Sequence, residues 1–223
     1  MTNFATDSDL LKWEPAILRD IVLDHQCLTA GQGAATEGFT VTADDGQFVT
    51  RCVRPGHVVH LANPEQGVDG FYEVLSVESE TALLAAIVGS ATGSAADGAV
   101  PLPTATDLAF RIQTFDPQHE EARYALLARF GLEADADDPA GDLVDWIAQR
   151  RTLRRPAVAL VLATLCRGQA AGGAAESGLA AKADHYAHLY EDEVAKARVL
   201  LDRDADGRPD DVRSLSSHRL HRA

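Results

Sequence analysis

The segment with the most specific chemical pattern is Asp202–Asp210, which reads Asp-Arg-Asp-Ala-Asp-Gly-Arg-Pro-Asp and is called the acidic loop below. Carboxylates stand at positions 1, 3, 5 and 9 of the run, and a glycine stands at position 6. This spacing of oxygen ligands around a glycine turn is typical of a loop that wraps a calcium ion. The predicted ligands are the carboxylates of Asp202, Asp204, Asp206 and Asp210 and the main-chain carbonyl of Arg208.

The acidic loop departs from the calcium pattern at its last position. Position 12 is Arg213, where loops of this kind carry a bidentate glutamate. Without that ligand, a site here is expected to be weak or to be completed by another segment. The alternative is an acidic turn after a long helix, in which Gly207 takes a positive φ and the aspartates bond to nearby main chain. The sequence leaves both interpretations open.

A second chemical feature is the basic segment Arg150–Arg155, which reads Arg-Arg-Thr-Leu-Arg-Arg in an otherwise acidic chain. Such a cluster can bind phosphate or an acidic partner surface. It can equally be a set of cations that complement the dipole at a helix C-terminus. We favour the second interpretation, because no glycine-rich turn or aromatic platform accompanies the arginines.

No arrangement typical of an enzyme is visible, and no enzymatic activity is expected. The chain lacks a G-x-S-x-G nucleophile elbow and a phosphate-binding G-x-x-x-x-G-K-[ST] loop. His185 and His188 are one helical turn apart, so they can ligate a metal or lie on a solvated helix face. An enzyme site near His119, Glu120 and Glu121 has little support, because the two adjacent carboxylates point apart on a helix.

The charge balance excludes one large class of function. Among 223 residues, 34 are Asp or Glu and 20 are Lys or Arg, so the formal net charge is −14. A protein that coats nucleic acid needs the opposite sign, although an acidic face lets DNA slide past without adhering. The sequence shows no transmembrane run and no secretory signal, and its three cysteines are expected to be reduced thiols in a protein made in the cytosol.

The periodicity predicts an α+β fold, mainly a helical bundle with a long C-terminal helix and an inserted small antiparallel β-barrel or sandwich. Residues 1–28 and 114–211 are expected to form the helical bundle, residues 29–113 the β domain and residues 212–223 a flexible tail. Residues 6–24 are predicted to be helical with a break or kink at Pro15, so one helix and two short helices fit the pattern equally well. Further helices are predicted over 119–130, 143–150, 157–166 and 177–201. A loop is expected over 29–38, and strands over 39–42, 48–53, 58–61, 70–77, 82–88 and 108–112.

Three segments resemble the head–tail connector proteins of tailed phages, also called adaptor or head completion proteins. They are the opening Phe4–Leu11, the β segment Phe48–Val77 with its Val53-Arg54-Pro55-Gly56 turn, and Leu179–Gly207 with its long helix and acidic loop. The resemblance implies a structural protein of the virion neck that binds the portal vertex as a ring after DNA packaging and joins head to tail.

The resemblance also implies the partners and the location. The partners are the portal protein, a downstream neck or tail protein and further copies of the chain in a homo-oligomeric ring, with DNA passing through the channel without sequence-specific binding. The protein is expected in the host cytoplasm during assembly and then in the virion, with no membrane association. The basic tail is the expected docking segment, through Arg213, His218, Arg219, Leu220, His221 and Arg222.

A function of another class remains open from the sequence. In this alternative the chain is a calcium-regulated soluble binding module that uses the Asp202–Asp210 loop. No cofactor is required by the connector hypothesis, whereas calcium is the ligand that this alternative requires.

Overall fold

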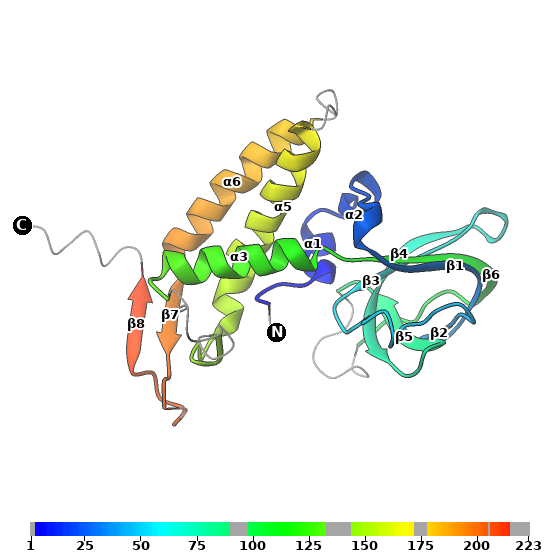
Figure 1. Cartoon of the computed structure of the whole chain (residues 1–223), viewed down its shortest axis with the longest axis horizontal. Coiled ribbons are helices and arrows are strands. Elements are labelled where there is room, and N and C mark those ends of the chain that lie inside the picture. Colours follow the sequence, from blue (N-terminus) through cyan, green and yellow to red (C-terminus); the bar gives the residue numbers. More distant parts are fainter. Residues whose placement is uncertain (1–2, 90–97, 133–143, 172–177, 205, 215–223) are drawn as a thin grey trace, which may run out of the picture. The chain divides into compact units, whose positions relative to one another are not determined.

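The computed structural model describes residues 3–89, 98–132, 144–171, 178–204 and 206–214. The chain divides into two compact units (Figure 1). One unit is Thr6–Phe115, and the other combines Met1–Ala5 with Asp116–Ala223. The helices near the N-terminus therefore group with the strands, whereas the sequence-based division had placed residues 1–28 with the helical bundle. We describe each unit by itself.

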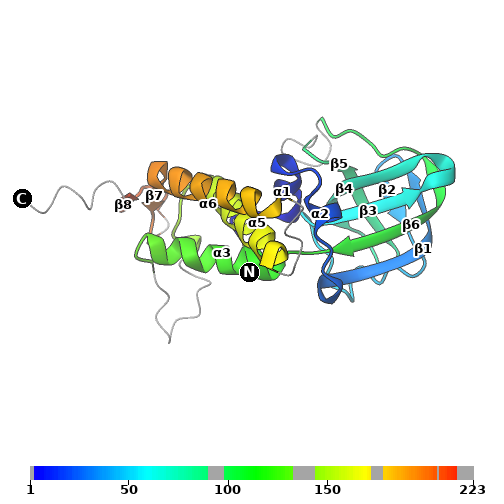
Figure 2. The ribbon, with the colours of Figure 1, turned by 90° about the horizontal axis from the view of Figure 1, so that it is seen from above.

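The unit Thr6–Phe115 contains a closed antiparallel barrel with the strand order β1-β2-β5-β4-β3-β6 (Figure 2). Pairing of the first strand with the last closes the barrel. The strands are β1 (Cys27–Glu37), β2 (Thr40–Thr42), β3 (Val58–Asn63), β4 (Val68–Val77), β5 (Ala82–Ile87) and β6 (Ala105–Gln113).

The prediction of a mainly helical bundle is wrong. The structure is 39% helical and 29% strand, and the closed barrel makes up most of one of its two units. The barrel has its own hydrophobic core, with fully buried side chains such as Val59, Leu83 and Ile112. The β region is therefore a folded unit with its own packing and not a small insertion into a bundle.

Strand β1 was missed because its residues are small and polar and do not alternate. A loop was predicted over 29–38, but residues 29–37 belong to this eleven-residue strand. Register shifts interrupt its pairing with β6 between Gly31 and Ala34 and again between Ala34 and Thr36. Such irregularities break the two-residue period on which the prediction depends. A Cβ atom at Gly31 would lie 2.6 Å from Cε1 of Phe110, so the glycine is required by close packing.

The strand predicted over 48–53 is also wrong. These residues form turns, in which Arg51 N donates to Gln47 O at 2.8 Å and Val53 N to Phe48 O at 2.9 Å. Phe48 is fully buried and meets Phe110 edge to face, with ring centroids 6.0 Å apart. Its hydrophobic character reflects its place in the barrel core and not a strand.

Two short helices precede the barrel strands, which is one of the two arrangements that Pro15 left open. They are α1 (Asp7–Trp13) and α2 (Ile17–Asp20), followed by the 3-10 turn η1 (Asp24–Gln26). Main-chain bonds hold α1 in place, since Ser8 N donates to Gly56 O at 3.0 Å and Phe115 N donates to Asp7 Oδ1 at 3.0 Å. Another 3-10 turn, η2 (Pro64–Gln66), connects β3 to β4.

The described residues of the second unit include three longer helices and a two-stranded sheet. Figure 1 shows α5 and α6 side by side, with α3 beside α5. The elements are α3 (Asp116–Arg129), the 3-10 turn η3 (Arg150–Leu153), α5 (Arg154–Ala171), α6 (Leu179–Lys196), β7 (Arg198–Leu201) and β8 (Asp211–Ser214). As predicted, residues 157–166 of α5 are mostly buried, and Gly131 follows α3 with a positive φ of 65°.

Two helix predictions in this unit need correction. The long helix predicted over 177–201 ends at Lys196, and residues 198–201 form β7 instead. Val199 and Leu201 are fully buried there. Apolar residues two positions apart fit one face of a strand as well as the apolar face of a helix. The helix predicted over 143–150 is too long, because among its described residues only Val144 and Asp145 are helical and Ile147 forms a β-bridge with Leu201.

Candidate functional site

The acidic loop connects the two strands of the β7–β8 hairpin. Pairing runs from Arg198 opposite Ser214 to Leu201 opposite Asp211. The other edge of β7 pairs with the segment before η3, since Ala148 N donates to Leu200 O at 3.0 Å and Asp202 N donates to Trp146 O at 2.8 Å. The first residue of the loop is therefore held by main-chain hydrogen bonds and not by its own side chain alone.

Three of the four predicted carboxylates come together in this loop. One oxygen from each of Asp202, Asp204 and Asp210 lies within 4.8 Å of the others. Main-chain donors orient all three. Gly207 N donates to Asp202 Oδ2 at 2.9 Å, Arg203 N to Asp210 Oδ2 at 2.8 Å, and Asp206 N to Asp204 Oδ1 at 3.3 Å. The cluster is thus the part of the described structure best suited to a cation.

The remaining predicted ligands are placed differently. Asp206 is not part of the three-carboxylate group, and its Oδ1 accepts a hydrogen bond from Arg208 N at 2.7 Å. Gly207 has a φ of 82°, the positive value that both interpretations of this loop require. Asp202 Oδ1 is shielded from solvent and has no hydrogen-bond partner among the described residues. The geometry therefore favours a site smaller than the one predicted from the spacing.

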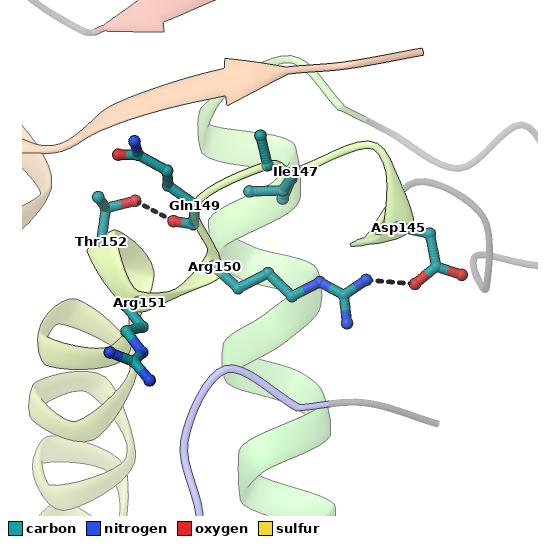
Figure 3. A pocket seen from close by; sticks show the side chains of 7 residues that line it. Asp145, Ile147, Gln149, Arg150, Arg151 and Thr152 are labelled. Atoms are coloured by element: carbon teal, nitrogen blue, oxygen red, sulfur yellow. Dashed lines mark hydrogen bonds and ion pairs between the residues drawn. The ribbon is translucent and has the colours of Figure 1, made fainter. Parts of the chain in front are cut away.

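The basic segment Arg150–Arg155 lines part of a cavity of about 650 Å³ (Figure 3). The figure shows Arg150 reaching to Asp145, with which it forms an ion pair. Thr152 Oγ1 donates to Gln149 O at 2.8 Å and so closes the turn at the start of η3.

The interpretation of these arginines as cations at a helix C-terminus is wrong. They form η3 and the first turn of α5, so they lie at the N-terminal end of that helix, where the helix dipole disfavours positive charge. Acidic residues offset this cost instead. Arg150 pairs with Asp145, and Arg155 Nε lies 3.2 Å from Glu193 Oε2.

Arg213, a predicted partner-binding residue, has a structural role in the unit that contains it. Its Nη1 donates to Phe130 O at 2.9 Å and to Gly131 O at 2.6 Å, and its Nε lies 3.3 Å from Asp211 Oδ2. The last carbonyl groups of a helix lack main-chain partners, and a cation beside them is favourable. Arg213 therefore joins β8 to the end of α3. The other predicted docking residues, His218, Arg219, Leu220, His221 and Arg222, lie outside the described residues.

The histidine and tyrosine pairs of α6 show no grouping suited to catalysis. His185 and His188 are exposed, and His188 Nδ1 lies 2.7 Å from Asp184 O of the same helix. Tyr186 is buried, and burial is the main cause that raises the pKa of Tyr190. These side chains pack or face solvent as ordinary helix residues.

One further group of side chains, on the outer face of the barrel, was not predicted from the sequence. His60 lies opposite Phe71 on β4 and opposite Arg111 on β6. The three residues are far apart in sequence, so their proximity follows only from the strand register. A cavity adjoins these three side chains.

Comparison with known proteins finds no matching family model, no matching curated protein and no matching solved structure. In the part of the chain that the structure describes, no helix combines the length and the apolar character needed to span a membrane.

Replacing Arg213 tests its role as a link between β8 and α3. We expect Arg213→Gln to lower the free energy of unfolding by about 1–3 kcal/mol, because two main-chain carbonyls lose a charged donor. Urea denaturation followed by circular dichroism measures the change. The matched control is Arg208→Gln, since Arg208 is exposed and no side-chain bond is found for it in the described structure. Equal stability of the two variants would contradict the assigned role.

Proposed function

We propose that the protein is a structural component of a tailed-phage neck that binds the portal vertex as a ring and joins head to tail. The observation that carries this proposal is the resemblance of three segments, from Phe4–Leu11 to Leu179–Gly207, to head–tail connector proteins. The proposed partners are the portal protein, a downstream neck or tail protein and further copies of this chain.

The attachment of the C-terminal tail supports a docking role. Strand β8 ends at Ser214, and Arg213 bonds to the carbonyls that follow α3. The basic residues of the tail, from His218 to Arg222, follow this hairpin directly in sequence. A docking segment that follows a hydrogen-bonded hairpin has a fixed point of attachment on the folded unit.

The charge of the chain supports passage of DNA through the ring. Acidic residues exceed basic ones by 14, and an acidic channel wall repels the phosphate backbone. DNA then passes without adhering.

The tail can be tested without disturbing the hairpin. We expect removal of residues 215–223 to abolish binding to purified portal rings, since the truncation leaves Arg213 and β8 in place but deletes the cationic docking residues. Co-sedimentation with portal rings measures the binding, and circular dichroism checks the fold.

A matched pair of full-length variants separates charge from length. His218, Arg219, His221 and Arg222 are replaced together by alanine in one variant, and Ser216 and Ser217 by alanine in the control. The first variant should bind at least tenfold more weakly than the control. Unchanged co-sedimentation of the truncated chain would remove the tail from the proposal.

A second candidate function is calcium-regulated binding through the acidic loop. The specific observation in its favour is the approach of the Asp202, Asp204 and Asp210 carboxylates to within 4.8 Å of one another. Oxygen ligands of this kind suit calcium, and three carboxylates repel one another unless a cation or main-chain donors offset their charge.

Calorimetric titration with calcium distinguishes this candidate from a simple acidic turn. If the loop binds calcium, Asp210→Asn should weaken the affinity at least tenfold, whereas Asp206→Asn should change it far less because Asp206 lies outside the cluster. Absence of heat at millimolar calcium would identify the loop as an acidic turn. Equal effects of the two substitutions would contradict the three-carboxylate geometry.

A further inference from the structure

A cavity of about 220 Å³ lies on the outer face of the barrel, beside α2. Its lining includes Arg19 and Val22 from the α2 segment, His60 from β3, Phe71 from β4, and Arg111 and Gln113 from β6. The cavity thus combines two guanidinium groups with apolar and aromatic walls. All of these residues belong to the unit Thr6–Phe115.

Strand register brings the planar side chains of this surface together. Phe71, His60 and Arg111 lie opposite one another across β4, β3 and β6. The His60 ring stacks on the Phe71 ring, with centroids 4.5 Å apart and planes inclined by 21°. The guanidinium carbon of Arg19 lies 5.7 Å from the centroid of the Phe71 ring. These contacts define one wall of the cavity before any ligand enters.

The cations at the cavity are paired with carboxylates of the chain itself. Asp69 accepts from His60 Nε2 at 2.8 Å and from Arg19 Nη2 at 3.0 Å, and its pKa is lowered mainly by the His60 hydrogen bond. Arg111 Nη2 lies 3.1 Å from Asp24 Oδ1. The Asp24 side chain is 93% exposed, so this ion pair is screened by water and a second carboxylate can replace Asp24 at little cost.

Two further polar atoms at the cavity lack partners. Arg111 Nε and Gln113 Oε1 are shielded from solvent and have no hydrogen-bond partner among the described residues. Gln113 is 5% exposed, and its Nε2 donates to Ile21 O at 3.0 Å, so its Oε1 is the end left without a donor. A ligand that satisfies both atoms must bring an acceptor and a donor, and it must shift the side chains that shield them.

We propose that this cavity binds a carboxylate that carries a neighbouring N–H donor and a small apolar group. The carboxylate pairs with Arg111 and Arg19, the N–H donates to Gln113 Oε1, and the apolar group packs against Val22 and Phe71. An N-acylated amino acid has this chemistry, and so does the C-terminal residue of a polypeptide. A volume of 220 Å³ equals that of roughly seven liquid waters, which is the size of one such residue.

The site is independent of the proposed neck function, because it uses neither the C-terminal tail nor the acidic loop. Its ligand differs from a nucleic acid, since the chain carries a net charge of −14 and the cavity accommodates a single small group. Asp24 and Asp69 already form ion pairs with Arg111 and Arg19, so a ligand must compete with them. The affinity for a ligand of one residue is therefore expected to be millimolar.

Titration of the full-length protein with N-acetyl-L-leucine, followed by two-dimensional ¹H–¹⁵N NMR, tests the proposal. We expect saturable shifts of the Gln113 side-chain amide and of main-chain amides in β3 and β6. N-acetyl-L-leucinamide lacks the carboxylate and should bind at least tenfold more weakly. Absence of shifts at 50 mM N-acetyl-L-leucine, roughly fiftyfold above a dissociation constant of about 1 mM, or equal binding of the amide, overturns the proposal.

Variants on the barrel surface provide the controls. Arg111→Gln and Arg19→Gln should each weaken binding of N-acetyl-L-leucine at least tenfold, because each removes one guanidinium group from the cavity. The matched control is Arg51→Gln, since Arg51 belongs to the same unit, is exposed and bonds to the neutral side chain of Gln47 at 3.1 Å. Two substitutions at separate places keep the test valid if one of them impairs folding. Binding that is unchanged in both variants overturns the proposal.

A peptide distinguishes the two kinds of ligand, an N-acylated amino acid and the C-terminal residue of a polypeptide. An octapeptide that ends in leucine with a free carboxylate is compared with N-acetyl-L-leucine in the same titration. Binding of the octapeptide at least tenfold tighter identifies the C-terminus of a partner chain as the ligand. Equal affinity identifies a small N-acylated acid. Binding of an octapeptide amide as tightly as the free acid contradicts both.

Discussion

Pairing of β1 with β6 is the constraint on which the barrel unit depends. It joins two strands whose paired residues are about eighty positions apart, and it leaves neither strand with an open edge. Several contacts adapt the two strands to each other. Gly31 leaves room for the Phe110 ring, and the Thr36 hydroxyl donates to Pro103 O at 2.6 Å and accepts from Ala105 N at 3.0 Å. Closure also fixes β6 against β3, and so places Arg111 beside His60.

A second constraint organises the other unit in a similar way. Strand β7 pairs with β8 on one edge and with the segment around Ile147 on the other. This arrangement fixes both ends of the acidic loop and the point at which the C-terminal tail begins. The Arg213 bonds to the main chain after α3 then attach the hairpin to a helix. One small sheet therefore positions the two features to which the sequence assigned function, namely the carboxylate cluster and the tail.

Local chemistry explains which parts of this structure the sequence predicts. Pro15 separates α1 from α2, Gly131 follows α3, and Gly207 takes the positive φ of the acidic loop, since each of these depends on one residue and its neighbours. The approach of Asp202 to Asp210 follows from spacing for the same reason.

Non-local packing explains what the sequence does not predict. The bulged pairing of β1, the burial of Phe48 in a turn and the change from α6 to β7 depend on partners far along the chain. The cavity between Arg19 and Arg111 exists only because strand register and α2 bring these residues to one surface. The spacing of residues along the chain predicts neither this non-local packing nor the cavity.

The central claim is that the protein joins head to tail in a phage neck. Electron microscopy of lysates from a phage that carries a stop codon in this gene tests that claim most directly. If the protein joins head to tail, we expect DNA-filled or leaking heads beside separate, complete tails, because both halves assemble but cannot be joined. Intact, infectious particles in those lysates would contradict it.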